Sequence, residues 1–103
     1  MTDAILPPDQ CSTMRDVREG VDATDQALMD LIETRFGYMR AAARIKQDRS
    51  AVRDEQRKAD VIAAVVARAR TATLPERALA DIWERLVETS IAYELVEWDR
   101  IRS

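Results

Sequence analysis

Apolar residues recur at intervals of three and four along most of this chain, and no stretch alternates as a half-buried strand would. The first periodic stretch starts at Ser12 or Thr13, either of which can cap a helix, and runs to about Asp48. Its apolar stripe consists of Val17, Val21, Leu28, Leu31, Ile32, Met39 and Ala42. A helix of about 36 residues is about 54 Å long. A globule of this size is only about 30 Å across. We therefore predict that a second copy covers the overhang.

Two shorter helices are predicted after a connector at residues 49–53. The first starts near Asp54, a good N-cap, and carries Ile62, Val65, Val66 and Ala69 on one face. Residues 71–75 break the chain, and the last helix runs from about Pro75 to Ile101. Its predicted buried stripe is Ile82 or Trp83, Leu86, Val87, Ser90, Ile91, Glu94, Trp98 and Ile101. The predicted fold class is all-α, with a three-helix protomer and a very long first helix.

Length and composition narrow the class of protein. The 103 residues predict one domain over residues 12–103, preceded by an N-terminal leader at residues 1–11. No run approaches the roughly 20 apolar residues that a bilayer needs. The start lacks a signal-peptide pattern, so we expect a cytoplasmic protein with no membrane partner. One cysteine, Cys11, and no histidine predict no metal site. A net charge of −3 argues against a nucleic-acid partner.

The basic residues suggest an anionic ligand. Fourteen of the sixteen are arginines, which suits bidentate binding of carboxylates, although a GC-rich genome would give the same bias. Arg35 and Lys46 are eleven residues apart, so on one helix both face the same way, roughly 16 Å apart. The alternative is that they are surface charges beside the stripe. Arg18 lies about 100° from Arg35 and is expected to face the partner chain.

Glu94 is the most informative acid, because it lies on the apolar stripe of the last helix. A carboxylate there is either paired with an arginine or partly protonated, since burial disfavours the charged form. Ser90 lies one turn earlier and by itself means little. Arg57, in the first turn of the second helix, either binds an anion with that helix's N-terminal amides or is solvated. No nucleophile–base pair, phosphate loop or metal motif is present, so any chemistry depends on positioned charges.

Several motifs together resemble the type II (AroQ-like) chorismate mutase family and its relative isochorismate pyruvate lyase. They span Cys11 to Arg102, and comprise residues 16–22, Asp25, Leu28, Leu31, Arg35, 41–46, 52–57 and 90–94. The spacing of Arg18, Arg35 and Lys46 fits this family without a gap. The resemblance implies an intertwined homodimer with two equivalent sites. Each site would take Arg35, Lys46 and Arg57 from one chain and Arg18 from the other.

The resemblance also implies roles and a substrate, with no cofactor and no metal. The implied binding residues are Arg18, Arg35, Lys46, Asp54, Arg57, Ser90 and Glu94, and Lys46, Glu94 and Arg35 would be catalytic. Arginines would hold the carboxylates of chorismate, or of isochorismate in a lyase. Lys46 would donate to the ether oxygen that gains charge, and a protonated Glu94 would donate to the same oxygen.

Three features bear on which reaction is catalysed. Bacterial mutases usually have glutamine at the position of Glu94, where fungal members have glutamate. Lys58 stands where a glutamate often contacts the substrate hydroxyl. The opening from Pro8 to Arg18 looks more like the lyase, whereas Ser90 favours the mutase. The prediction is chorismate mutase, with the lyase as the alternative. A catalytically silent helical dimer is a lesser alternative, disfavoured because the four basic site residues are all present.

Overall fold

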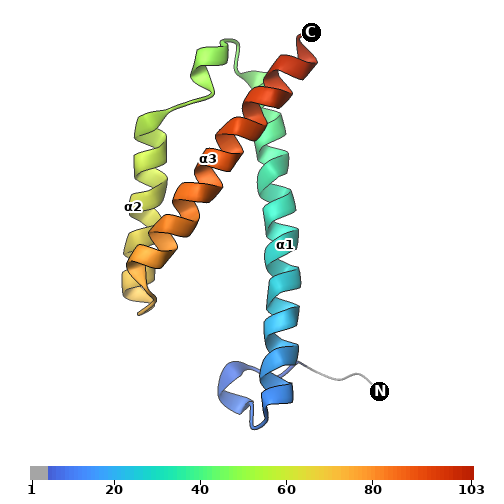
Figure 1. The fold of residues 1–103 in the computed structure, drawn as a ribbon, viewed down its shortest axis with the longest axis vertical. Coiled ribbons are helices and arrows are strands. Elements are labelled where there is room, and N and C mark those ends of the chain that lie inside the picture. The colour runs from blue at the N-terminus through green and yellow to red at the C-terminus, as the bar shows by residue number, and fades with distance from the viewer. Residues whose placement is uncertain (1–4) are drawn as a thin grey trace. The chain divides into compact units, whose positions relative to one another are not determined.

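A computed structural model describes residues 5–103, which form three α-helices and two short 3₁₀ helices without any strand (Figure 1). The elements in chain order are η1 (Pro8–Gln10), α1 (Met14–Ile45), η2 (Arg49–Ala51), α2 (Glu55–Thr71) and α3 (Glu76–Ile101). The predicted all-α class and the long first helix are confirmed. None of the helices in this described part is long and apolar enough to cross a bilayer. The first four residues of the leader predicted at 1–11 lie outside the described residues.

The chain divides into two compact units, Met1–Phe36 and Gly37–Ser103, and α1 contributes its start to the first and its end to the second. In the first unit Thr13 caps α1, as the sequence allowed. Its Oγ1 accepts from the Asp16 amide at 3.1 Å, and Asp16 Oδ2 accepts from the Ser12 and Thr13 amides at 3.1 and 3.2 Å. These bonds, the Ser12 amide first, lower the pKa of Asp16. The exchange is a reciprocal cap that fixes where α1 begins.

Residues 5–11 fold back beside the first turns of α1 in the same unit (Figure 1). Between this segment and residues 17–25 of α1 lies a mainly apolar hollow of about 530 Å³. Four members of the predicted apolar stripe of α1 are exposed in this unit: Val17, Val21, Leu28 and Leu31, the last with 65% of its surface accessible. A stripe of this kind requires either a partner or continued contact with water.

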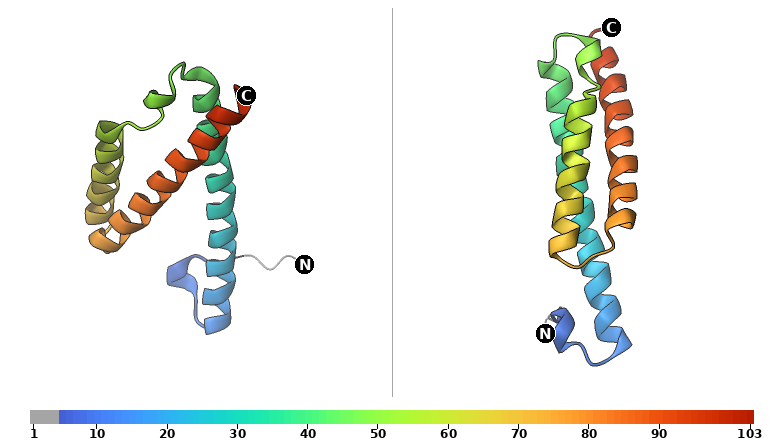
Figure 2. Two further views of the ribbon diagram at one scale, coloured as in Figure 1. Left: turned by 45° about the horizontal axis from the view of Figure 1, so that its top comes forward. Right: turned by 90° about the vertical axis from the view of Figure 1, so that its left-hand side faces the viewer.

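The second unit is built on a hairpin of α2 and α3, which lie close together near their connecting turn and diverge away from it (Figures 1 and 2). At the end of α2 the Leu74 amide donates to the Ala69 carbonyl at 2.8 Å, and the Thr73 amide donates to that of Arg70 at 3.2 Å. This is a Schellman ending, which requires a left-handed residue. Thr73 takes that place with φ 57°, although glycine is the usual residue there.

A small apolar core joins the hairpin to the connector before it. Its buried members are Val52, Val87 and Ile91, against which Val61, Trp83, Leu95 and Trp98 pack. Val52 is 3% exposed, so the predicted connector at residues 49–53 is anchored in the core. Of the two residues considered for the start of the α3 stripe, Trp83 packs and Ile82 is exposed. The prediction that Ile101 is buried was wrong, because this last residue of α3 is 37% exposed.

The end of α1 comes three residues earlier than the predicted end at Asp48, at Ile45. Trp98 near the end of α3 and Arg102 just after it hydrogen-bond to carbonyls that further turns of α1 would have used. Trp98 Nε1 donates to the Lys46 carbonyl at 3.0 Å, and Arg102 donates to the carbonyls of Ala43 and Lys46 at 3.0 and 2.7 Å. Asp48 is already extended, with φ −113° and ψ 135°. Lys46 therefore lies just beyond the helix and not within it.

Candidate active site

The second unit contains one buried ion pair, between Lys46 and Glu94. Lys46 Nζ lies 2.9 Å from Glu94 Oε2, and the two side chains are 30% and 5% exposed. The contact is electrostatic and not a well-directed hydrogen bond, since Oε2 has no hydrogen-bond partner among the described residues. Lys46 Nζ also lies 3.5 Å from the Val52 carbonyl. The pair thus has a buried acceptor on α3 and a partly accessible ammonium.

The sequence offered an arginine partner or protonation for Glu94. The structure gives it a lysine instead, and the burial predicted from the α3 stripe is confirmed. Ser90 is also buried, at 3% exposure, one helical turn before Glu94. Its Oγ donates to the Leu86 carbonyl of its own helix at 2.7 Å. The serine hydroxyl hydrogen is therefore engaged by the backbone of its own helix.

The start of α2 carries two further predicted residues. Asp54 is the N-cap, as predicted, and its Oδ1 accepts from the Arg57 amide at 2.9 Å. The Arg57 side chain is exposed in the first turn of α2. An exposed arginine beside the positive end of a helix is suited to an anion.

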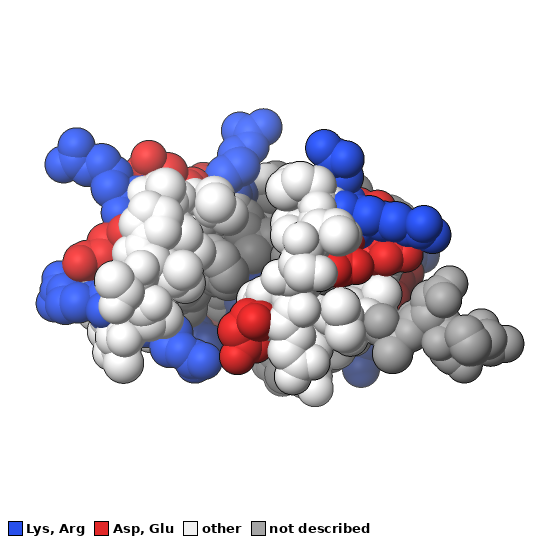
Figure 3. All heavy atoms as spheres, turned by 90° about the horizontal axis from the view of Figure 1, so that it is seen from below, with Lys and Arg blue, Asp and Glu red and all other residues white. Residues whose placement is uncertain are grey.

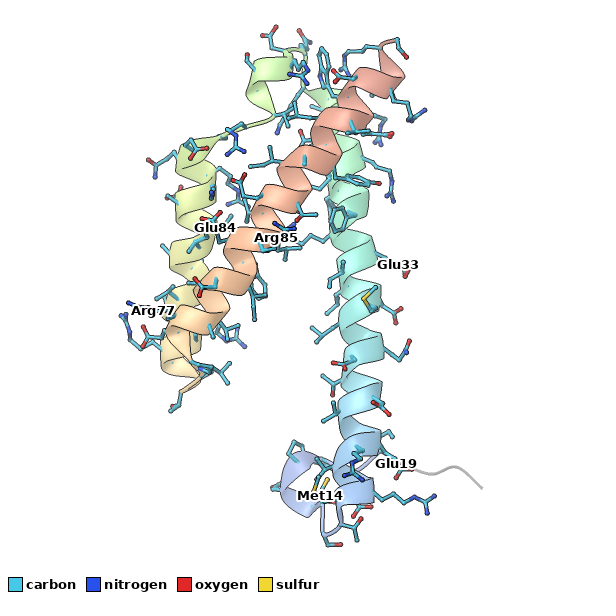
Figure 4. The ribbon with its side chains drawn as sticks, viewed as in Figure 1. Met14, Glu19, Glu33, Arg77, Glu84 and Arg85 are labelled. Atoms are coloured by element: carbon cyan, nitrogen blue, oxygen red, sulfur yellow. The ribbon has the colours of Figure 1, made fainter. Side chains whose placement is uncertain are left out.

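Lys58, the next residue, points toward α3 and contacts two of its carboxylates. Its Nζ lies 2.6 Å from Glu84 and 2.8 Å from Glu88, and Arg53 donates to Glu88 at 2.8 and 3.0 Å. Figure 4 labels Glu84 on the hairpin. Glu84 and then Glu88 raise the pKa of Lys58, while Arg53 and then Lys58 lower the pKa of Glu88 to about 2. The cluster ties the start of α2 to α3 and occupies the Lys58 ammonium.

Arg18 and Arg35 belong to the first unit, on α1. Arg18 is exposed and Arg35 is half-buried. Within the second unit the structure brings Lys46 and Glu94 together, with Ser90 one helical turn before Glu94, while the shared use of the two arginines stays a prediction. On the face drawn in Figure 3, basic and acidic side chains are interspersed and do not gather into one basic patch. In the described part of the chain, no cluster of acidic or sulfur side chains is arranged for a metal.

Two residues at this site were not foreseen as contributors. Trp98 was predicted for the stripe, but its bond to the Lys46 carbonyl was not. Arg102 carries no sequence feature that separates it from the other thirteen arginines. Only the folded chain brings both residues to the end of α1.

Comparison with known protein families identifies the class of protein to which this chain belongs. The family model for chorismate mutase type II matches residues 17–95, well over half of the chain. The chain belongs to the chorismate mutase type II family. The match contains Arg18, Arg35, Lys46, Arg57, Ser90 and Glu94. No curated protein is similar enough to count as a match.

Proposed function

We propose that this protein is a chorismate mutase, which rearranges chorismate to prephenate in one step without a cofactor. The observation that carries the proposal is the Lys46–Glu94 pair, 2.9 Å apart and largely buried, in a chain of this family. The reaction breaks a carbon–oxygen bond and forms a carbon–carbon bond within one molecule. It needs a folded substrate conformation and a donor for the ether oxygen, and no proton relay.

In this proposal Lys46 is the principal donor. Its ammonium is held by Glu94 on one side, yet 30% of its side chain is accessible, so a ligand oxygen can approach. Charge developing on the ether oxygen would strengthen that hydrogen bond as the bond breaks. Arg57, exposed at the start of α2, would bind a carboxylate together with Arg35.

Glu94 would contribute a second hydrogen bond only when protonated, because a carboxylate repels a developing negative charge. Binding of a substrate whose oxygen engages Lys46 would compete with Glu94 for the ammonium. Glu94→Gln provides a neutral donor of nearly the same shape. We expect this variant to match or exceed the parent in turnover at about pH 8, where a free carboxyl is ionised. A variant without activity at that pH would make Glu94 a structural partner of Lys46.

The finer alternative is isochorismate pyruvate lyase, which the opening from Pro8 to Arg18 favours. Both reactions use a dicarboxylate whose ether bond breaks, so one set of cations serves either. Lys58 bears on the choice between the two reactions, because it stands where a glutamate often contacts the substrate hydroxyl. Its ammonium is paired with Glu84 and Glu88 and is therefore not available to contact that hydroxyl. Purified protein incubated separately with chorismate and isochorismate, with each loss followed by absorbance, distinguishes the reactions. Loss of neither compound would favour the silent dimer.

We further propose a homodimer in which Arg18 completes the partner's site. The support is the exposed apolar stripe on α1, which a partner chain would remove from water. Mixing inactive Arg18→Ala and Arg35→Ala proteins would then create one intact site in each re-paired dimer. Activity should reappear after subunit exchange. No recovery after verified exchange would mean that Arg18 acts within its own chain or has no role.

A further inference from the structure

The end of α1 poses a problem for any mechanism that relies on Lys46. The helix ends at Ile45, so the Lys46 backbone has lost the regular support of a helix interior. Its amide still donates to the Ala42 carbonyl at 2.9 Å, but its carbonyl accepts no hydrogen bond from a later turn of the helix. A donor that must meet one substrate oxygen needs a fixed backbone, because any displacement of the Lys46 Cα atom also displaces the ammonium at the end of its flexible side chain.

The missing support comes from Trp98 near the end of α3 and from Arg102, which follows the last residue of that helix. The Lys46 carbonyl accepts two hydrogen bonds, from Trp98 Nε1 at 3.0 Å and from Arg102 Nη2 at 2.7 Å. Arg102 Nη1 also donates to the Ala43 carbonyl at 3.0 Å, one turn back in α1. One guanidinium thus bridges two carbonyls at the negative end of a helix, where a cation is favoured.

Trp98 also fixes the arginine. The Arg102 guanidinium lies 4.1 Å from the centre of the Trp98 ring, within the range of a cation–π contact. The indole is half-buried and packs on the apolar core. The arginine is therefore held by a ring that is itself held by the core. A lysine could not reproduce this, since it lacks the planar fork that reaches both carbonyls.

We propose that Trp98 and Arg102 are positioning residues for Lys46: they cap the end of α1 and set the place of the ammonium. The inference rests on the proposed function, in which Lys46 donates to the reacting oxygen. Arg102 would not touch the substrate in this scheme. It would act only through the Lys46 backbone, so its removal should change turnover while substrate affinity stays nearly constant.

The test uses Arg102→Ala, Arg102→Lys and Trp98→Phe, with Arg100→Ala as the matched control. Arg100 lies in the last turn of α3 with the same charge, but its guanidinium bonds Glu97 of its own helix. We expect Arg102→Ala to lower kcat about 10- to 100-fold with KM within about threefold, as for a displacement near 1 Å. Arg102→Lys and Trp98→Phe should show intermediate losses, and Arg100→Ala should match the parent. A rise in KM with an unchanged kcat would overturn the inference.

A double-mutant cycle with Lys46→Ala separates positioning from general destabilisation. If Arg102 acts through Lys46, adding Arg102→Ala to Lys46→Ala should lower the residual kcat by less than about threefold. Equal losses in both backgrounds would overturn the inference. Lys46→Ala with full turnover would instead contradict the proposed function, so the two failures differ.

The chain offers a second readout that does not require activity. Lys46 and Lys58 are its only lysines, so ¹⁵N-lysine labelling gives one backbone amide signal from each. Arg102→Ala should shift the Lys46 signal and leave the Lys58 signal in place, whereas Arg100→Ala should move neither. An unchanged Lys46 signal in folded Arg102→Ala protein would show that the contact does not hold this residue.

Discussion

Lys46→Ala is expected to destabilise the fold by about 3 kcal/mol, because it leaves the Glu94 carboxylate buried without its partner. Breaking a buried ion pair from one side typically costs about 3–5 kcal/mol. The lower end applies here, since the Lys46 side chain is 30% exposed and water can enter the space that it leaves. The Glu94 side chain itself is only 5% exposed, so water would solvate the remaining carboxylate poorly.

The opposite truncation should be milder. Glu94→Gln leaves an ammonium that can turn toward water, and its cost is expected to be about 1 kcal/mol. Removing both charges in Lys46→Ala with Glu94→Gln eliminates the stranded carboxylate. The double variant should therefore be more stable than Lys46→Ala alone by about 1–2 kcal/mol, even though it carries one more substitution.

Urea unfolding followed by circular dichroism, at one protein concentration throughout, measures these differences. The slope of the free energy of unfolding against urea should stay constant across the four proteins. Equal stability of Lys46→Ala and the double variant would refute the reasoning. It would mean that Glu94 bears no charge in the folded chain or that the carboxylate finds solvent without Lys46.

Three further outcomes follow from the second unit. Arg53 and Lys58 lower the pKa of Glu88 from 4.5 to about 2, so this carboxylate stabilises the fold fully above pH 4.5 and loses its effect as the pH falls toward 2. The difference in unfolding midpoint between the parent and Glu88→Gln should therefore narrow over that range. A constant difference would contradict the pairing. Val52→Ala should cost about 2 kcal/mol in denaturant unfolding because it removes two buried methyl groups, whereas Ala51→Ser on the exposed neighbour should stay within about 0.5 kcal/mol. Thr73→Gly should raise stability by about 0.5–1 kcal/mol, since glycine adopts the left-handed conformation without the steric cost that threonine bears; a lower melting temperature would show that this turn relaxes in solution.

The helices themselves were predictable because their signals are local. The threonine cap at the start of α1, Asp54 at the start of α2 and Pro75 before α3 each act within one turn of chain. The burial of Glu94 was also predictable, since a carboxylate on a 3.6-residue apolar stripe shares the fate of the stripe. The family could likewise be inferred from the order and spacing of the basic residues.

Contacts between distant residues could not be predicted in this way. The sequence predicted either an arginine partner or partial protonation for Glu94, but which cation lies at 2.9 Å depends on how the end of α1 meets α3. The burial of Val52 in a connector, and the early end of α1 at Ile45, arise from the same packing. Arg102 reaches the Lys46 carbonyl across 56 residues of chain. Periodicity fixes which face of each helix is apolar, because that is a local geometric property. Only the tertiary structure decides which polar groups meet at the helix ends, because those partners come together only after the core has packed.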